Sequence, residues 1–208
     1  QPVAYDHPFS WKAEDLSAIL ARLFLEERVG LMDNAKPAKP VFSPAEIDLI
    51  ETAVREAFKK ALPSEWIAFL LFLPKADETV VTSGGLFVES HRLHVVLANH
   101  HTSVGNHSEE LGRVRANPFY SIKGSGGVLV FEPTRFKIAT KANWAGGHRA
   151  SASELILDHS AFLSYLTHAA SRENPIPAVP PPTEQTSVKE PTSTEARSGQ
   201  DAFHDLPA

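Results

Sequence analysis

The stretch between Phe42 and His100 constrains the fold most, because its hydrophobic pattern changes there from helical to extended. Ser43 is the predicted N-cap of a helix, Pro44 suits its first position, and Glu46 completes a capping box. Apolar residues then recur at helical spacing until Pro63 stops the helix. Three segments rich in valine, leucine and phenylalanine follow and predict strands at 66–73, 79–89 and 92–100.

The composition of these segments also predicts how they pair. Every residue from Trp66 to Leu73 is apolar, which is typical of a central strand covered on both faces. The next two strands form a hairpin that turns at Ser90-His91, and Gly84-Gly85 predicts a bulge or a close backbone approach. Residues 101–118 are expected to form a polar loop, and residues 126–132 and 135–140 a second hairpin.

The two ends of the folded region leave alternatives open. A helix is predicted from about Trp11 with Ser10 as its N-cap, and its end, as far as Glu27, is open because Phe24-Leu25 also suits a strand. Residues 154–158 read as a strand before a helix at 160–170, or as the start of one helix from residue 153. The aromatic opening Tyr5–Phe9 is expected to lie as a strap over the helices.

The order of these elements predicts an α+β domain over residues 1–174. We expect a largely antiparallel sheet of about five to six strands, packed by two N-terminal helices and one C-terminal helix. Residues 175–208 are rich in proline, serine, threonine and glutamate, and acidic residues outnumber basic ones there. Such a segment cannot bury enough apolar surface to offset its ordering entropy, so a disordered acidic tail is predicted.

Charge and cysteine content exclude several classes of protein. The net charge is −5 and much of it lies in the tail, so the body carries no basic stripe and no nucleic-acid partner is predicted. The absence of cysteine excludes disulfides, thiolate metal sites and cysteine nucleophiles. No apolar run reaches the ~20 residues that a transmembrane helix requires, so no transmembrane segment is expected. The chain opens at Gln1 without methionine, which suggests either a processed, exported protein or a removed tag.

Five histidines lie close together in the sequence, at positions 91, 94, 100, 101 and 107. Imidazoles are common zinc and copper ligands, but residues of one strand alternate between its faces, so a site requires the following loop to fold back. The candidate metal ligands are therefore His100, His101, His107 and Glu109, and the alternative is that these side chains are simply exposed. No catalytic or cofactor-binding residue is predicted, because the glycine-rich Lys123–Gly127 fits neither a phosphate loop nor a serine elbow.

Two sequence features carry a resemblance: the opening Tyr5-Asp6-His7-Pro8, and residues 81–88 followed by 92–98. Together they resemble uncharacterised bacterial cell-envelope proteins that are often made as lipoproteins, although such proteins begin at a cysteine that this chain lacks. The resemblance implies a periplasmic or envelope location, with the cytoplasm left open, and it carries over no activity and no site residue.

We therefore expect a non-enzymatic structural or interaction module, an accessory subunit of a bacterial envelope or membrane-associated assembly, with protein partners. The expected contact surfaces are residues 100–118 and any exposed edge of the sheet. Two alternatives stay open. One is a metal-binding protein or metal-dependent enzyme that uses the histidines of residues 91–107, and the other is a small-ligand binder with a pocket between helices and sheet.

Overall fold

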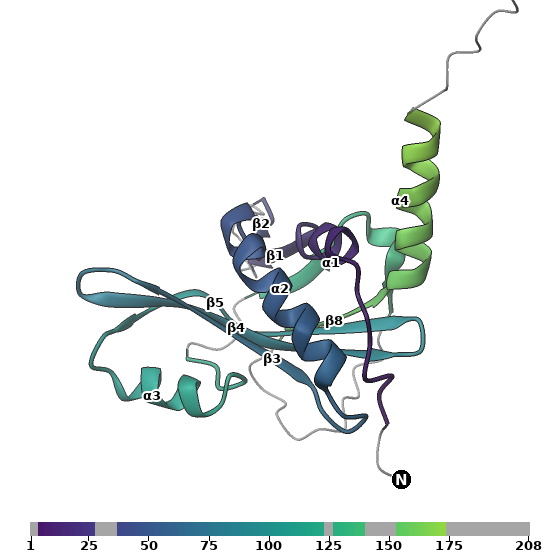
Figure 1. Cartoon of the computed structure of the whole chain (residues 1–208). Helices are drawn as coiled ribbons and strands as arrows, with labels where there is room; N and C mark the ends of the chain where they lie inside the picture. The colour runs from purple at the N-terminus through teal and green to yellow at the C-terminus, as the bar shows by residue number, and fades with distance from the viewer. Residues whose placement is uncertain (1–3, 28–36, 123–126, 140–152, 174–208) are drawn as a thin grey trace, which may run out of the picture. The chain divides into compact units, whose positions relative to one another are not determined.

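The computed structural model of the chain describes residues 4–27, 37–122, 127–139 and 153–173 (Figure 1). Within this part, four α-helices accompany two antiparallel sheets, so the predicted α+β class is confirmed. Residues 1–173 form one compact unit, and the disorder predicted for 175–208 lies outside the described residues. The elements are α1 Ala13–Leu20, β1 Leu23–Glu27, β2 Lys39–Pro40, α2 Pro44–Lys60, β3 Ile67–Pro74, β4 Glu78–Glu89, β5 Arg92–Gly105, α3 Glu109–Ala116, β6 Gly127–Phe131, the 3-10 turn Thr134–Phe136, β7 Lys137–Ile138, β8 Ser153–Asp158 and α4 His159–Glu173.

The larger sheet has the strand order β3-β4-β5-β8-β7, with every neighbouring pair antiparallel. The predicted hairpin of β4 and β5 is confirmed, and its register shifts between Val81 and Gly84 as the double glycine indicated. A Cβ atom on Gly84 would collide with the carbonyl oxygen of Val96 and would lie 2.8 Å from the Phe69 ring. The prediction that 66–73 is a central strand is wrong, because β3 lies at the edge of this sheet.

The smaller sheet has the order β2-β1-β6 and forms from segments far apart in the chain. The predicted hairpin of 126–132 with 135–140 is wrong: β6 pairs with β1, and β7 pairs with β8 in the other sheet. The first helix ends at Leu20 because residues 23–27 are drawn into the pairing of β1 with β6. At the other end of the unit, a strand before a helix is the alternative that the structure shows, with β8 leading directly into α4.

Helix α2 follows the sequence prediction most closely. The Ser43 hydroxyl accepts a hydrogen bond from the Glu46 backbone N–H, and the Glu46 carboxylate accepts one from the Ser43 backbone N–H at 2.7 Å. Helix α1 departs from its prediction, since its N-cap is Lys12 and not Ser10, with no side-chain cap. Helix α3 and the last residues of β5 replace most of the loop predicted at 101–118.

Two hydrophobic clusters lie on opposite faces of the larger sheet. The first collects buried side chains from α1, α2, α4 and both sheets, with Phe58 of α2 fully buried in it. The second is smaller and packs Leu111 and Val114 of α3 against Val81 and Val104. Alternate residues of β3 contribute to the two clusters, so both faces of this strand are apolar although it lies at an edge.

The N-terminal strap packs against α2, as expected from its aromatic residues, and also against β4, which was not predicted. The His7 ring is buried, lies 5.2 Å from the Phe58 ring between centroids, and its Nε2 accepts a hydrogen bond from the Val88 N–H at 3.2 Å. The Tyr5 N–H donates to the Pro63 carbonyl and the Phe9 N–H to the Phe58 carbonyl. These bonds close one side of the core and leave the β3 side of α2 uncovered by the strap.

Candidate functional site

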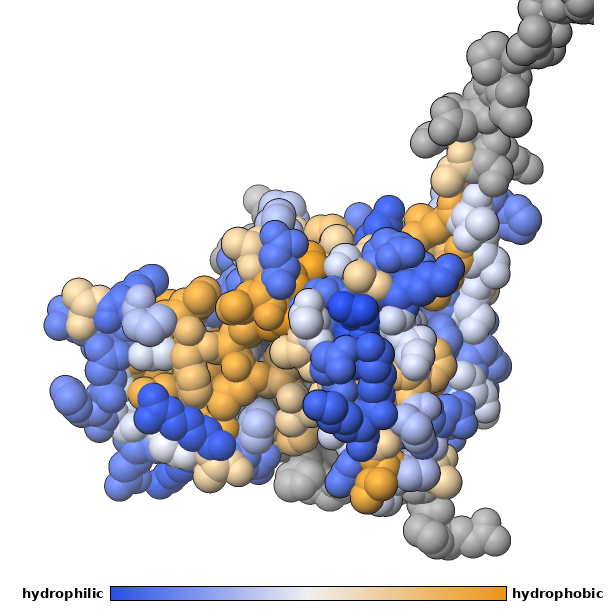
Figure 2. Space-filling view, viewed as in Figure 1, coloured by the Kyte–Doolittle hydropathy of each residue, from blue (hydrophilic) through white to orange (hydrophobic). Residues whose placement is uncertain are grey.

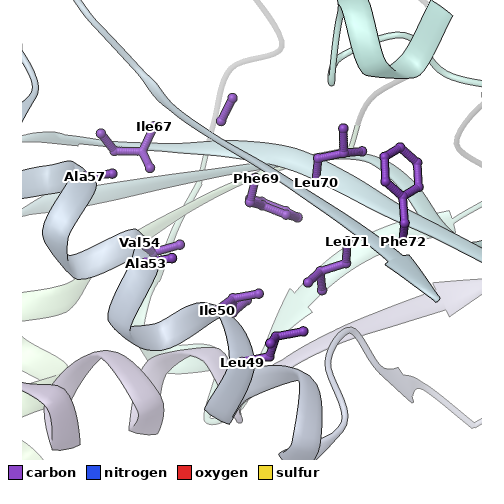
Figure 3. Close-up of a pocket in the computed structure, with 11 residues that line it drawn as sticks. Leu49, Ile50, Ala53, Val54, Ala57, Ile67, Phe69, Leu70, Leu71 and Phe72 are labelled. Carbon is purple, nitrogen blue, oxygen red and sulfur yellow. The ribbon is translucent and has the colours of Figure 1, made fainter. Parts of the chain in front are cut away.

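An apolar groove runs between helix α2 and strand β3 (Figure 3). Its volume is about 410 Å³, and all of its lining residues are apolar. Residues 67, 69 and 71 of β3 point toward the helix, which supplies the opposite wall. We call this feature the α2 groove; its lining residues are Leu49, Ile50, Ala53, Val54, Ala57, Ile67, Ala68, Phe69, Leu70, Leu71 and Phe72.

Several side chains at the groove are exposed although they are hydrophobic. Leu49 is 63% exposed and Leu73, which follows the groove residues along β3, is 39% exposed. Ala53 is also exposed and lies one helical turn after Leu49, so the side of α2 that faces β3 carries an apolar ridge with a small residue at its centre. Figure 2 shows hydrophobic residues gathered on this face of the molecule, between α2 and α3.

The hydrogen-bonding side of β3 that points away from β4 borders the α2 groove. We call it the β3 edge (residues 67–74). No described strand pairs with it, since β3 has β4 as its only neighbour in the sheet. In an antiparallel strand, alternate residues direct their N–H and C=O groups away from the paired neighbour. The β3 edge therefore presents free backbone groups beside an apolar surface, without a charged residue between Ile67 and Pro74.

The groove is positioned by features that the sequence specifies locally. The capping box fixes the start of α2, and Ile50, Val54 and Phe58 anchor its inner face in the main core. Gly84 of β4 leaves room for both neighbouring strands, because a Cβ there would meet the Phe69 ring of β3 and the Val96 carbonyl of β5. The sequence analysis predicted that an exposed sheet edge would be a contact surface but did not identify which one. The signal it missed is Leu49 and Ala53, which widen the apolar stripe of α2 toward one side.

The structure brings together only part of the predicted metal-ligand set. The Nε2 atom of His101 lies 3.0 Å from Oε1 of Glu46, while Nε2 of His100 lies 3.1 Å from the Pro40 carbonyl oxygen. The two imidazole centroids are 4.4 Å apart, but their ring nitrogens bind different groups. Among the described residues, no group of three or more histidine, aspartate or glutamate side chains could hold a metal ion.

The other two candidates lie elsewhere. His107 is exposed in the turn before α3, and Glu109 accepts a hydrogen bond from Nη2 of Arg113 at 2.9 Å within that helix. His100 and His101 lie with their rings side by side because His101 has a left-handed backbone with φ of 44° where the register of β5 shifts, whereas successive residues of a regular strand point to opposite faces. The arrangement thus links β5 to β2 and α2, a structural role for these two histidines.

The electrostatics of this link follow from burial and hydrogen bonding. Burial lowers the pKa of His100 below its usual value, and the neighbouring His101 lowers it further. Burial alone would raise the pKa of Glu46, but hydrogen bonds from Ser43 and His101 outweigh it, so this carboxyl titrates below its ordinary range. Glu46 is therefore an anion held at the start of α2, where the helix dipole also favours negative charge.

Two further histidines are buried in the aromatic core. His159 lies 5.0 Å from the Trp11 ring and 5.6 Å from the Phe9 ring, measured between centroids. Desolvation lowers the pKa of His159 and also that of His7. His94, one of the five histidines that lie close together in the sequence, is stacked on Phe87, and its Nδ1 lies 3.2 Å from Oε1 of Glu154. These histidines belong to the packing of the fold, and none of them lines the α2 groove.

Comparison with known protein families, characterised proteins and solved structures gives no match for this chain. Within the described residues, the structure also contains no helix with the length and hydrophobicity needed to cross a membrane. The functional argument therefore depends on the geometry of the chain itself. The feature best suited to binding is the β3 edge together with the α2 groove, which offers backbone hydrogen bonds and apolar area but no charged or catalytic side chain.

Proposed function

We propose that this protein is a non-enzymatic interaction module, an accessory subunit of a bacterial envelope or membrane-associated assembly, that binds an extended apolar segment along the β3 edge. The envelope location follows the resemblance of the opening residues and of the β4–β5 hairpin. The observation that supports the binding mode is the eight-residue apolar strand at an edge of the sheet where no described strand pairs. Long apolar edge strands that lack a charge or a bulge are sites where another strand pairs.

The groove supplies the second half of the binding surface. A strand added at the β3 edge would place alternate side chains over α2, against Leu49, Ala53 and Ala57. The two alanines are small enough to leave room for the side chains of the added strand. Burial of an exposed leucine such as Leu49 stabilises a complex by about 1.5–3 kcal/mol. Main-chain hydrogen bonds then fix the direction of the segment, and the groove selects apolar side chains at every second position.

The lining of the groove argues against a small polar ligand. Small-molecule pockets are largely apolar but contain a few placed polar groups that orient the ligand. All eleven side chains that line the α2 groove are apolar, so only the backbone of β3 supplies polar partners. An extended peptide uses backbone groups in a regular row, which matches what the β3 edge presents.

Site-specific photo-crosslinking tests this proposal. A photoreactive amino acid replaces Leu49 in the full chain, and the matched control replaces Asp48, which is exposed on a different side of α2. We expect crosslinks from position 49 that map, by mass spectrometry, to an apolar segment of a protein partner, and few from position 48. Equal crosslinking at the two positions, or crosslinks from position 49 only to lipid, would contradict the proposal.

A further inference from the structure

We infer that the strand received at the β3 edge is β3 of a second copy of this chain, in antiparallel orientation, with Leu70 on the two-fold axis. This inference rests on the proposed function and names its partner. It draws on the sequence of β3, on the charged residues that flank the strand, and on the shape of α2 beside it. The sequence and the flanking charges select the register in which the two copies of β3 pair, and the shape of α2 is compatible with that register.

Symmetry restricts the register first. A two-fold axis that joins two antiparallel strands of one sheet runs perpendicular to that sheet, so each residue faces the same side in both copies. Residues opposite one another must then both face α2 or both face α3, and one residue on the axis must lie opposite its own copy. Apolar residues occupy all positions from Ile67 to Pro74, so an axis near the middle of β3 sets apolar residues of the strand opposite one another.

The flanking charges select one register. With Leu70 on the axis, Glu65 lies opposite Lys75 of the second copy, and this pair occurs twice in the dimer. Both residues are exposed, and Lys75, which bonds Glu78 at 3.2 Å within its own chain, has further donors available. An axis at Leu71 would instead place Glu65 opposite Asp77, two like charges, and an axis at Phe69 would place it opposite Leu73.

Side-chain sizes fit the same register. On the α3 side of the sheet, the small Ala68 lies opposite the large Phe72 of the second copy. On the α2 side, Phe69 lies opposite Leu71, and Ile67 opposite Leu73. Cross-strand pairs of aromatic and aliphatic residues are among the favourable combinations in antiparallel sheets. The exposed Leu73 thereby becomes buried in the interface.

Helix α2 is compatible with this pairing because the ridge it turns toward the β3 edge is small. Ala53 lies at the centre of that ridge, between Leu49 and Ala57. The two copies of α2 lie on the same face of the joined sheet and approach one another across the axis. Alanines at such a contact permit interaxial distances at the short end of the usual ~8–10 Å. The leucines at position 49 then close the two ends of the helix contact.

A disulfide test exploits the absence of cysteine from the chain. Residues directly opposite in antiparallel strands have Cα atoms about 4.5–5.5 Å apart, within the range that a disulfide spans. We expect Leu70→Cys to form a covalent dimer on mild oxidation. Ala68→Cys is the matched control, because its two copies would lie four residues apart along the strands, roughly 13 Å, and should stay unlinked.

Sedimentation of the unaltered chain provides the second measurement, since Leu70 is half-buried and its replacement affects the second core cluster. We expect a concentration-dependent dimer that Leu49→Asp weakens by about 100-fold or more, because each dimer loses two apolar side chains from its interface. Crosslinking of Ala68→Cys alone, or a monomer at all concentrations, would overturn the inference. In the latter case, position-49 photo-crosslinks to an apolar segment of a different protein would still uphold the proposed function, and their absence would reject both.

Discussion

The larger sheet has β3 at one edge and β7 at the other, and the two strands differ in length, composition and cover. Strand β7 is two residues long, carries the exposed Lys137, and follows a turn whose Phe136 packs on Phe162 of α4. Strand β3 is eight residues long and has no charged residue. Short, charged edge strands discourage pairing with other chains, whereas long apolar ones invite it. One edge of this sheet is therefore protected from pairing with another chain, and the other is suited to a partner.

The largest expected effect comes from disrupting the packing of β4 against β5, the two strands that lie between β3 and β8 in the larger sheet. Gly84→Ala should lower the free energy of unfolding by about 3 kcal/mol or more, because its Cβ would collide with the Val96 carbonyl in the middle of the sheet. Gly105→Ala is the control, since nothing lies within 4 Å of a Cβ at that position, and it should change stability by about 0.5 kcal/mol or less. Urea unfolding of both variants measures the difference, and similar losses would contradict the packing of β4 against β5.

A matched pair of lysine substitutions compares the two edges directly. Leu73→Lys at the exposed end of β3 should abolish detectable association, because it places an unpaired charge in the apolar interface. Ile138→Lys in β7 should leave association unchanged and cost at most about 1–2 kcal/mol of stability, since Ile138 is partly buried. Sedimentation equilibrium distinguishes them. Loss of association by the β7 variant alone would reverse the assignment of the two edges.

Acid should affect the packed interior and neither edge. His7, His100 and His159 have lowered pKa values because burial disfavours their charged forms. Below about pH 6.5 the unfolded chain binds protons that the folded chain does not, so stability should fall as pH drops through this range. Above it, stability should be constant with respect to these groups.

His159→Phe tests the source of this acid sensitivity. The ring lies among Phe9 and Trp11, so phenylalanine suits the site and removes one titrating group. The variant should lose less stability than the parent chain when urea unfolding is compared at pH 7.5 and 5.5. An unchanged pH dependence would mean that His159 takes up its proton without unfolding the core.

The smallest expected effect concerns the charges at the ends of β3. Glu65→Lys should weaken dimerisation by up to about 30-fold, since exposed ion pairs contribute ~1 kcal/mol or less each and two pairs are lost. The double exchange Glu65→Lys with Lys75→Glu should restore association, because opposite charges again face one another. Sedimentation at low salt measures both variants. Failure of the double exchange to recover any affinity would count against the Leu70-centred register.

What the sequence predicts well is local. The start of α2 depends on Ser43 and Glu46, three residues apart, and the β4–β5 turn on two residues, so both were predictable without knowledge of the rest of the chain. The pairing of Leu23–Glu27 with Gly127–Phe131 joins segments about a hundred residues apart, and no local signal specifies it. The helical spacing of residues 16–23 continued into this strand and hid the boundary.

The candidate site was only partly predictable for a related reason. The uniform hydrophobicity of Trp66–Leu73 predicts cover on both faces, and the structure shows this only in part: the face toward α2 is buried, whereas the other face is exposed at Ala68 and half-buried at Leu70 and Phe72. The hydrophobic pattern does not indicate whether the strand has one neighbour or two, because side chains lie on the faces of a strand and not along its hydrogen-bonding edges. Likewise, the left-handed backbone of His101 places its imidazole beside that of His100, although successive residues of a regular strand point to opposite faces.

Amide hydrogen exchange of the β3 backbone tests the central claim most directly. The parent chain and Leu49→Asp are compared at a concentration where the parent associates, with β7 as the internal reference. The account predicts that the amides of Ile67–Leu73 that point away from β4 exchange much more slowly in the parent than in the variant, while those of Lys137 and Ile138 exchange alike in both. Equal exchange along β3 in the two proteins, despite association of the parent, would show that the partner docks elsewhere.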